Sequence, residues 1–224
     1  MVTAWTNSNH YKYALKMGMI NEDTDTIKVL LMRSGFVFNR DAHATRLNIK
    51  GVIGPVSTIA FVDGGGGNDS ITDSGSGFLT AGLVAGNRFT ISGSASNNVT
   101  LVALSVVAGT IEVATGSLTA EGAGAAVTIT ADDELTTGGG YTQDTKTTGA
   151  TTVTEDDTND RCDTTFPTVT WTAAGANIGP TPGAILYSDT SSDNTIIGYL
   201  DFGGEQTIVP PDSLNIGNGT LRLA

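Results

Sequence analysis

The sequence predicts an all-β fold with mainly antiparallel strands, interrupted by an inserted β module, and three observations support this prediction. First, Gly (29 of 224 residues), Ser and Thr are abundant and only 15% of residues are charged, which is typical of β proteins with many turns. Second, short β-branched runs alternate with polar turns, and Val169–Thr172 has the period-2 alternation of a half-buried strand. Third, the composition changes near Gly54-Pro55 and again at Asp132, which indicates a second module inserted into the first.

Residues 1–58 and 132–224 are predicted to form one discontinuous, β-sandwich-like base domain. Ala184–Tyr187 and Thr195–Phe202 are apolar and β-branched, and the polar residues between them predict a hairpin. Thr26–Arg33 is dense in aliphatic residues, which predicts a central strand. The core of this domain is predicted to contain Val29, Leu31, Trp171, Ile185, Tyr199 and Phe202.

Other segments of the base domain are less regular. Trp5–Ile20 fits a strand period and a helix period, but its good helix formers favour one short helix, with Ser8 as N-cap and Gly18 as the stop. Gly35–Asn39 predicts a further short strand. Ala174–Gly183 is expected to be an ordered surface loop, because its two prolines lack an amide proton.

Residues 59–131 carry few charges and many small residues, and they predict a small inserted β-sandwich or barrel. An insertion at a surface loop costs little when its two ends lie close together. Its candidate strands are Ile59–Asp63, Arg88–Ser92, Val99–Val107, Thr110–Ala114 and Ala126–Thr130.

The net charge of −12 is unevenly distributed: +3 over residues 1–58, −4 over 59–131 and −11 over 132–224. Such an acidic surface disfavours nucleic acid and anionic membranes as partners. No apolar run approaches the ~18 residues that span a bilayer, and the N-terminus lacks the pattern of a signal peptide. Cys162 is the single cysteine, which excludes an intrachain disulfide and a cysteine-based zinc site.

The residues that could carry chemistry do not form recognisable motifs. His10 and His43 are the two histidines, and neither lies in the pattern of a nucleophilic triad. Gly64–Gly67 lacks the Lys-Ser/Thr pair of a phosphate-binding loop. Asp201 and Glu205 form a carboxylate pair, which a glycosidase requires, but β proteins also contain such pairs by chance. We therefore expect no catalytic residues and no cofactor.

Two groups of acidic residues are candidate calcium ligands. Asp156, Asp157, Asn159 and Asp160 could present several oxygens to Ca²⁺, but they lack the spacing of an EF-hand. Asp69 and Asp73 are a weaker pair. A solvated turn is the default interpretation of an acidic run, so no metal site is predicted.

Several segments resemble a family of small structural proteins of tailed bacteriophages. They are YKYALKMGMINEDTDTIKVLLMRSGFVFNRDAHAT, ELTTGGGYTQDTKT, VTEDDTNDR and VTWTAAGANIGPTPGAILYSDTSSDNTIIGYLDFGG. In that family the DAHAT segment is followed closely by the ELxTGxGYT segment, whereas about ninety residues separate them here, which supports an insertion. The insert, from ITDSGSGFLTAGLVAGNRFTISGS to AVTIT, resembles a β module that recurs in phage structural and tail proteins.

The resemblance implies a non-enzymatic virion protein, made in the bacterial host cytoplasm. The favoured expectation is a capsid decoration or cement protein that forms a homo-oligomer and binds the major capsid protein. A tail- or fibre-associated adhesin is the alternative, although the insert has no Trp or Tyr with which to stack a sugar. A virion-borne hydrolase is a third hypothesis.

Contact with the capsid or a neighbouring subunit is predicted from charge and loop stiffness. The basic residues of the first segment can meet an acidic surface, and a proline-stiffened loop loses little entropy on docking. The predicted interface residues are Lys12, Lys16, Arg33, Arg40, Arg46, Ile178, Pro180 and Pro182.

Overall fold

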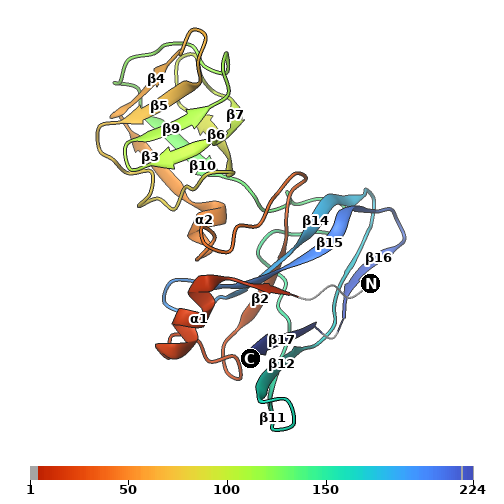
Figure 1. The fold of residues 1–224 in the computed structure, drawn as a ribbon. Coiled ribbons are helices and arrows are strands. Elements are labelled where there is room, and N and C mark those ends of the chain that lie inside the picture. The colour runs from red at the N-terminus through yellow and green to blue at the C-terminus, as the bar shows by residue number, and fades with distance from the viewer. Residues whose placement is uncertain (1–4, 218, 224) are drawn as a thin grey trace. The chain divides into compact units, whose positions relative to one another are not determined.

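The computed structural model describes residues 5–217 and the backbone of residues 219–223. The chain divides into two compact units: unit 1 comprises residues 1–46 and 134–224, and unit 2 comprises residues 47–133. Both are built mostly from antiparallel strands, so the predicted all-β class is confirmed (Figure 1). The finer prediction of a sandwich in each unit stays a prediction.

Unit 1 is organised around a four-stranded main sheet with the order β1-β15-β14-β2. Its strands are β1 (Thr6–Asn7), β2 (Ile27–Leu31), β14 (Ile178–Ser188) and β15 (Ile196–Ile208). Strands β14 and β15 form the predicted hairpin, and they are the longest paired strands in Figure 1.

The central part of the main sheet is buried on both faces, which explains why β2 and the adjoining parts of β14 and β15 are continuous apolar runs. On the first face Leu31 and Ala184 belong to a core that also contains Trp171. On the second face Leu30, Ile185 and Tyr199 form one cross-strand row. The predicted core is therefore split: Val29, Leu31 and Trp171 lie in the first core, Phe202 packs against it partly buried, and Ile185 and Tyr199 are buried outside it.

Strand β2 ends the main sheet, although its apolar sequence predicts a central strand. A non-strand segment covers its outer side instead: Val29 donates its N–H to Lys146, and Thr148 donates to Ile27. Single bridges join Lys28 to Thr147 and Met32 to Glu134. A strand covered by an irregular segment is as apolar as a strand covered by another strand, so the sequence of β2 does not distinguish the two cases.

The prediction of a loop over Ala174–Gly183 is wrong for its second half, because β14 begins at Ile178. The prolines are accommodated because β2 pairs with β14 only from Ala184 onward, so no neighbour on that side requires their amide protons. On the other side, the register with β15 shifts on either side of Thr181. Gly35–Asn39, predicted as a strand, is also irregular in the structure.

A short helix near the N-terminus is confirmed as α1 (Asn9–Lys16), with Ser8 at the N-cap. The Ser8 hydroxyl donates to the His43 carbonyl (3.2 Å) and not to the helix. The helix ends before Gly18, whose φ of +67° is readily adopted only without a side chain. Tyr11 and Ala14 face the first core.

The rest of unit 1 consists of two small sheets. One has the order β11-β12-β17, from β11 (Thr152–Asp156), β12 (Arg161–Phe166) and β17 (Gly219–Leu223). The other pairs β13 (Val169–Thr172) with β16 (Ser213–Ile216). A buried polar cluster joins β12 of the first small sheet to α1: Glu22 accepts hydrogen bonds from the Tyr11 hydroxyl (2.5 Å) and the Thr164 hydroxyl (2.6 Å).

Unit 2 contains helix α2 and two four-stranded sheets, whose buried side chains form one hydrophobic cluster. Strands β5 and β10 alternate strictly between buried and half-buried residues, as expected for sheets with one buried face. Helix α2 comprises Leu47–Lys50. The first sheet has the order β3-β10-β6-β7, with β3 (Val52–Val56), β10 (Val127–Ala131), β6 (Arg88–Ser92) and β7 (Thr100–Val102). The second sheet has the order β4-β5-β9-β8, with β4 (Ile59–Val62), β5 (Asp69–Asp73), β9 (Thr110–Val113) and β8 (Ser105–Val107).

The few carboxylates of unit 2 hold its glycine- and serine-rich loops. Asp69 accepts the N–H groups of Gly64 (3.0 Å), Ser117 (2.6 Å) and Leu118 (2.8 Å). These backbone hydrogen bonds, that of Gly64 first, lower the pKa of Asp69. Glu121 in the same way accepts hydrogen bonds from the segment Ser94–Asn97. The Gly64–Gly67 turn is thus fixed to Asp69 at its first residue.

The boundaries of the second unit differ from the predicted 59–131. Strand β3 pairs with β10, so residues 52–56 belong to the same sheet as the last strand of unit 2. At the junction, Arg46 is the last residue of unit 1 before the insertion and Glu134 is the first after it. Their side chains form an ion pair (Nη2–Oε2 3.6 Å), so the two ends of unit 1 lie close together.

Deletion of residues 47–133, with a short Gly-Ser linker between Arg46 and Glu134, is expected to leave a folded unit 1. The reasons are the proximity of these two residues and the separate hydrophobic core of each unit. The isolated segment 47–133 should fold as well. The measurement is chemical unfolding followed by circular dichroism; a deletion variant without a cooperative transition would contradict the expectation.

Candidate interaction surface

The loop between β2 and α2 covers part of the second face of the main sheet. Phe36 and Phe38 lie against Tyr199, with ring centroids 5.8 and 5.3 Å apart, and Phe36 also stacks on His43 at 5.2 Å. Tyr199 can lie over β14 because residue 183 is Gly: a Cβ there would overlap the Tyr199 ring. The aromatic residues of the loop are therefore packed on strands and are held in place.

A turn from Asn39 to His43 fixes the loop. The Asn39 side chain accepts the N–H groups of Asp41 (2.9 Å) and Ala42 (3.1 Å), and His43 Nδ1 accepts the Asn39 N–H (3.1 Å). The imidazole is buried, and burial lowers the pKa of His43 to about 4. His43 is thus neutral near pH 7 and acts as a packed ring within the DAHAT segment.

A shallow hollow of about 390 Å³ lies beside this loop. Phe36, Phe38, Tyr199 and Pro182 line it together with Val37, whose side chain is 80% exposed. We call these five residues the loop face. An apolar residue this exposed, on a segment anchored by packed aromatic rings, is typical of a contact surface.

Asp201 and Glu205 line the same hollow. Glu205 accepts hydrogen bonds from the Ser34 hydroxyl (3.1 Å) and the Gly35 N–H (2.9 Å), and so it ties β15 to the start of the loop. Asp201 accepts the Gly203 N–H (2.8 Å). These bonds give the carboxylate pair a structural role and an acidic position beside the loop face.

The predicted interface residues occupy different environments. Lys12 and Lys16 are exposed on α1, Arg40 is exposed in the loop, and Arg33 is half-buried with its guanidinium on the Ser34 carbonyl (2.8 Å). Pro180 is exposed, and Pro182 belongs to the loop face. Ile178 is buried at the start of β14, so it cannot contact a partner without unfolding that end of the strand.

Arg46 is engaged within unit 1 and is not available as an exposed charge. It pairs with Asp144 (3.0 Å) and Glu134 (3.6 Å), and its guanidinium carbon lies 5.5 Å from the centre of the Tyr187 ring. Lys28 pairs with Asp189 (2.9 Å) in the same region. Part of the basic excess of the first segment is thus neutralised by the acidic last segment.

The calcium candidates are engaged in other contacts. Asp156 binds the Asn159 amide (2.7 Å) and Arg161 (2.9 Å), and Asp69 and Asp73 accept hydrogen bonds from their own loops. Across the residues that the structure describes, no group of three or more His, Cys, Asp or Glu side chains is arranged to hold a metal ion.

The histidines and the cysteine lie apart in the structure. His10 pairs with Asp193 (2.8 Å), and His43 packs among aromatic rings. Cys162 is half-buried in β12. The His10 ring pairs with a carboxylate and the His43 ring accepts a backbone N–H, so the contacts of the two imidazoles are those of surface pairing and packing.

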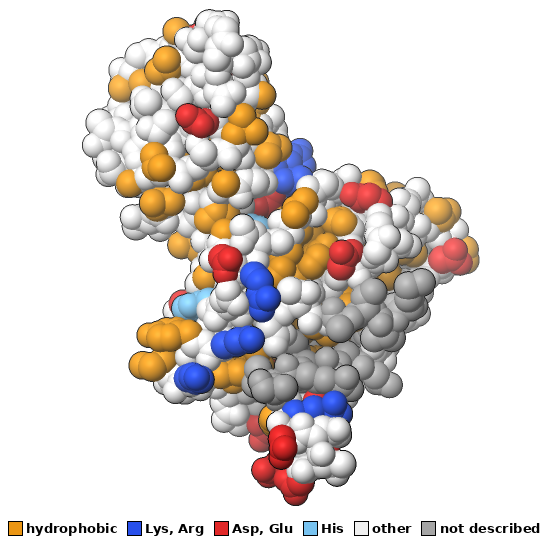
Figure 2. All heavy atoms as spheres, viewed as in Figure 1, with side chains coloured by type: hydrophobic (Ala, Val, Ile, Leu, Met, Phe, Trp, Pro, Cys, Tyr) orange, Lys and Arg blue, Asp and Glu red, His pale blue; other side chains and the backbone are white. Residues whose placement is uncertain are grey.

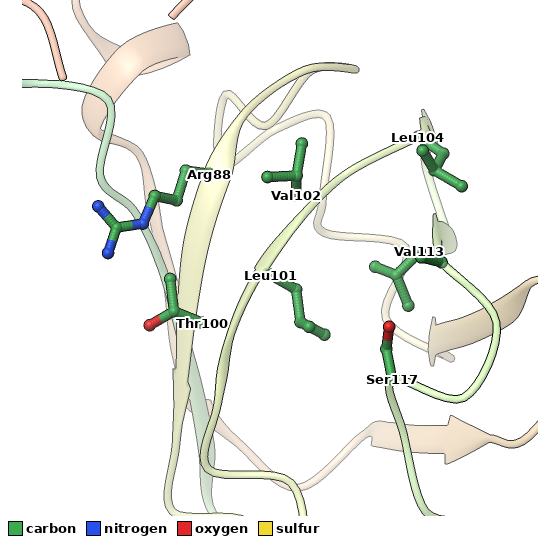
Figure 3. A pocket seen from close by; sticks show the side chains of 8 residues that line it. Arg88, Thr100, Leu101, Val102, Leu104, Val113 and Ser117 are labelled. Carbon is green, nitrogen blue, oxygen red and sulfur yellow. The ribbon is translucent and has the colours of Figure 1, made fainter. Parts of the chain in front are cut away.

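Unit 2 has an apolar hollow of its own, of about 330 Å³, between β7 and the end of β9 (Figure 3). Leu101, Leu104 and Val113 border it, and the guanidinium of Arg88 points away from them. Strands β7 and β8 end their respective sheets, so one segment of the chain supplies an outer edge of both. The residues around this hollow carry little charge that could select a partner.

Comparisons of the chain with protein-family models, with curated proteins and with solved structures found no match. No helix in the described part of the chain is long and apolar enough to cross a bilayer.

Proposed function

We propose that the protein is a non-enzymatic structural protein of a tailed-bacteriophage virion, and that it decorates the capsid by binding the major capsid protein. The observation that carries this proposal is the loop face, where Val37 projects beside a hollow lined by aromatic rings and a proline. The resemblance of the flanking segments to phage structural proteins supplies the identity of the particle.

The loop face has the physical properties of an attachment site. Its apolar residues can bury against the capsid protein, and the Asn39 turn and Glu205 hold the loop before binding, which reduces the entropy lost on docking. The acidic groups Asp201 and Glu205 at the hollow favour a partner with a basic residue at the matching place. Attachment to a regular shell repeats this contact at every equivalent position.

The test compares two exposed valines. Val37→Asp places a charge in the loop face and is expected to lower the occupancy of purified protein on undecorated heads about tenfold or more, as loss of a contact worth ~1.4 kcal/mol would do. Val107→Asp, at an exposed position in unit 2 (58% exposed, against 80% for Val37), is the control and should bind like the wild type. Occupancy is measured by sedimentation of the heads with bound protein.

Two results would contradict the proposal. Loss of binding only with the Val107 variant would mean that unit 2 attaches the protein. Recovery of the wild-type protein from purified tails, with none on heads, would favour the tail-associated alternative.

A further inference from the structure

The outward face of α1 combines two lysines with two exposed apolar side chains. Lys12, Tyr13, Lys16 and Met17, which we call the helix face, share one side of the helix and its last turn. Tyr13 is 54% exposed and Met17 is 60% exposed, whereas the opposite side of α1 is buried in the first core. Figure 2 shows these two kinds of side chain, apolar and basic, next to each other over α1.

The described residues do not neutralise the positive charge of the helix face. Among the described residues, neither Lys12 nor Lys16 has an ion-pair partner, whereas Lys28, Arg46 and Arg161 each bind carboxylates. A surface that is basic and apolar fits a partner that is acidic and apolar. The net charge of −12 makes a nucleic acid an unfavourable partner for the molecule as a whole.

The hairpin of β11 and β12, which we call the acid hairpin, is such a surface. It borders a groove of about 530 Å³ lined by Val153, Cys162 and acidic residues. Arg161 forms ion pairs with Asp156 (2.9 Å) and Asp163 (3.2 Å). Glu155, Asp157 and Asp160 are exposed and have no ion-pair partner among the described residues. Red side chains gather at this hairpin in Figure 2.

We propose that the helix face of one copy binds the acid hairpin of a second copy. The two surfaces have opposite charge, and each offers apolar area, Tyr13 and Met17 on one and Val153 on the other. Because they are different surfaces, the contact is head-to-tail, and repetition of it closes a ring or extends a chain. Every molecule supplies both halves, so the partner is present at the same concentration as the protein itself.

The salt concentration decides whether this contact forms, because it sets the distance over which charges act. The net charge of −12 makes two copies repel each other at long distance, but at ~0.1 M salt the screening length is about 10 Å. The long-range repulsion is then screened more strongly than the attraction between charges in contact. The two surfaces offer few apolar side chains, so we expect reversible association that weakens again near 1 M salt.

The experiment uses two charge-reversed full-length variants and sedimentation velocity at about 0.1 M salt. The helix variant carries Lys12→Glu and Lys16→Glu, and the hairpin variant carries Glu155→Lys, Asp157→Lys and Asp160→Lys. Each variant alone should associate about tenfold more weakly than the wild type, because like charges then face each other. A mixture of the two should regain association, since the reversed helix face again meets a surface of opposite charge.

Arg88→Glu, a charge reversal in unit 2, is the matched control and should associate like the wild type. Equal circular dichroism spectra exclude misfolding as the cause of weak association. The proposal is overturned if the wild type stays monomeric, if the helix variant associates normally, or if the mixture is no stronger than its components. None of these outcomes depends on binding to heads, so they are independent of the proposed attachment.

Discussion

Glu134→Ala is expected to lower the free energy of unfolding of unit 1 by about 3–5 kcal/mol, the cost of removing one partner from a buried ion pair. The Glu134 carboxylate is fully buried, pairs with Arg46, and accepts the Tyr141 hydroxyl (2.9 Å) and the Asp144 N–H (2.7 Å). The substitution leaves the cation and both donors without this acceptor in a place that water does not reach easily.

The measurement is denaturant unfolding followed by tryptophan fluorescence, because Trp5 and Trp171 both belong to unit 1. Glu155→Ala, on the acid hairpin, removes an exposed carboxylate and should change the free energy by less than about 0.5 kcal/mol. A double-mutant cycle with Arg46→Ala should show a coupling of at least ~0.5 kcal/mol. A loss below about 1 kcal/mol for Glu134→Ala would show that the pair contributes little to stability.

Trp171→Ala is expected to destabilise unit 1 by about 3–5 kcal/mol, the range for removing a large aromatic side chain from a core. Trp171 is 4% exposed and lies in the first core. The centre of its ring lies 6.1 Å from the centre of the Tyr141 ring and 5.8 Å from the Lys146 ammonium. The variant leaves a cavity next to Tyr141, whose hydroxyl also accepts the Leu31 N–H.

Unfolding of this variant is followed by circular dichroism, since the main fluorophore of the core is removed. Val209→Ala, at an exposed apolar position of unit 1, should stay within about 0.5 kcal/mol of the wild type. If the two substitutions have similar small effects, Trp171 does not contribute to the core as its burial indicates.

The candidate surface could be predicted only in part. Exposure of Lys12, Lys16 and Arg40 agrees with their charge and with the solvated side of a short helix. The loop face was missed, because Phe36, Val37 and Phe38 have the composition of a strand and nothing local shows which of them is exposed. A usable signal was the absence of regular alternation around Gly35, next to the turn-forming Asn39-Arg40-Asp41.

The environments of Arg46 and Ile178, two of the predicted interface residues, could not be read from the sequence. Arg46 carries the same charge as Arg40 in the sequence, and only the return of the chain at Glu134 and Asp144 makes it a half-buried, ion-paired residue. Ile178 stands among Gly and Pro residues that predict a loop, but β15 supplies the backbone partner that makes the segment a strand. Both outcomes depend on residues far away in the chain.

The sequence by itself determined the all-β class, helix α1, the β14–β15 hairpin and most strands of unit 2. These features arise from local composition and periodicity, which act over a few residues. Only the tertiary structure decided that β2 ends its sheet, that β3 belongs to unit 2, and that Arg46 meets Glu134 at the junction. The physical reason is that strand pairing and burial of charge are set by contacts between residues distant in sequence, which no local pattern encodes.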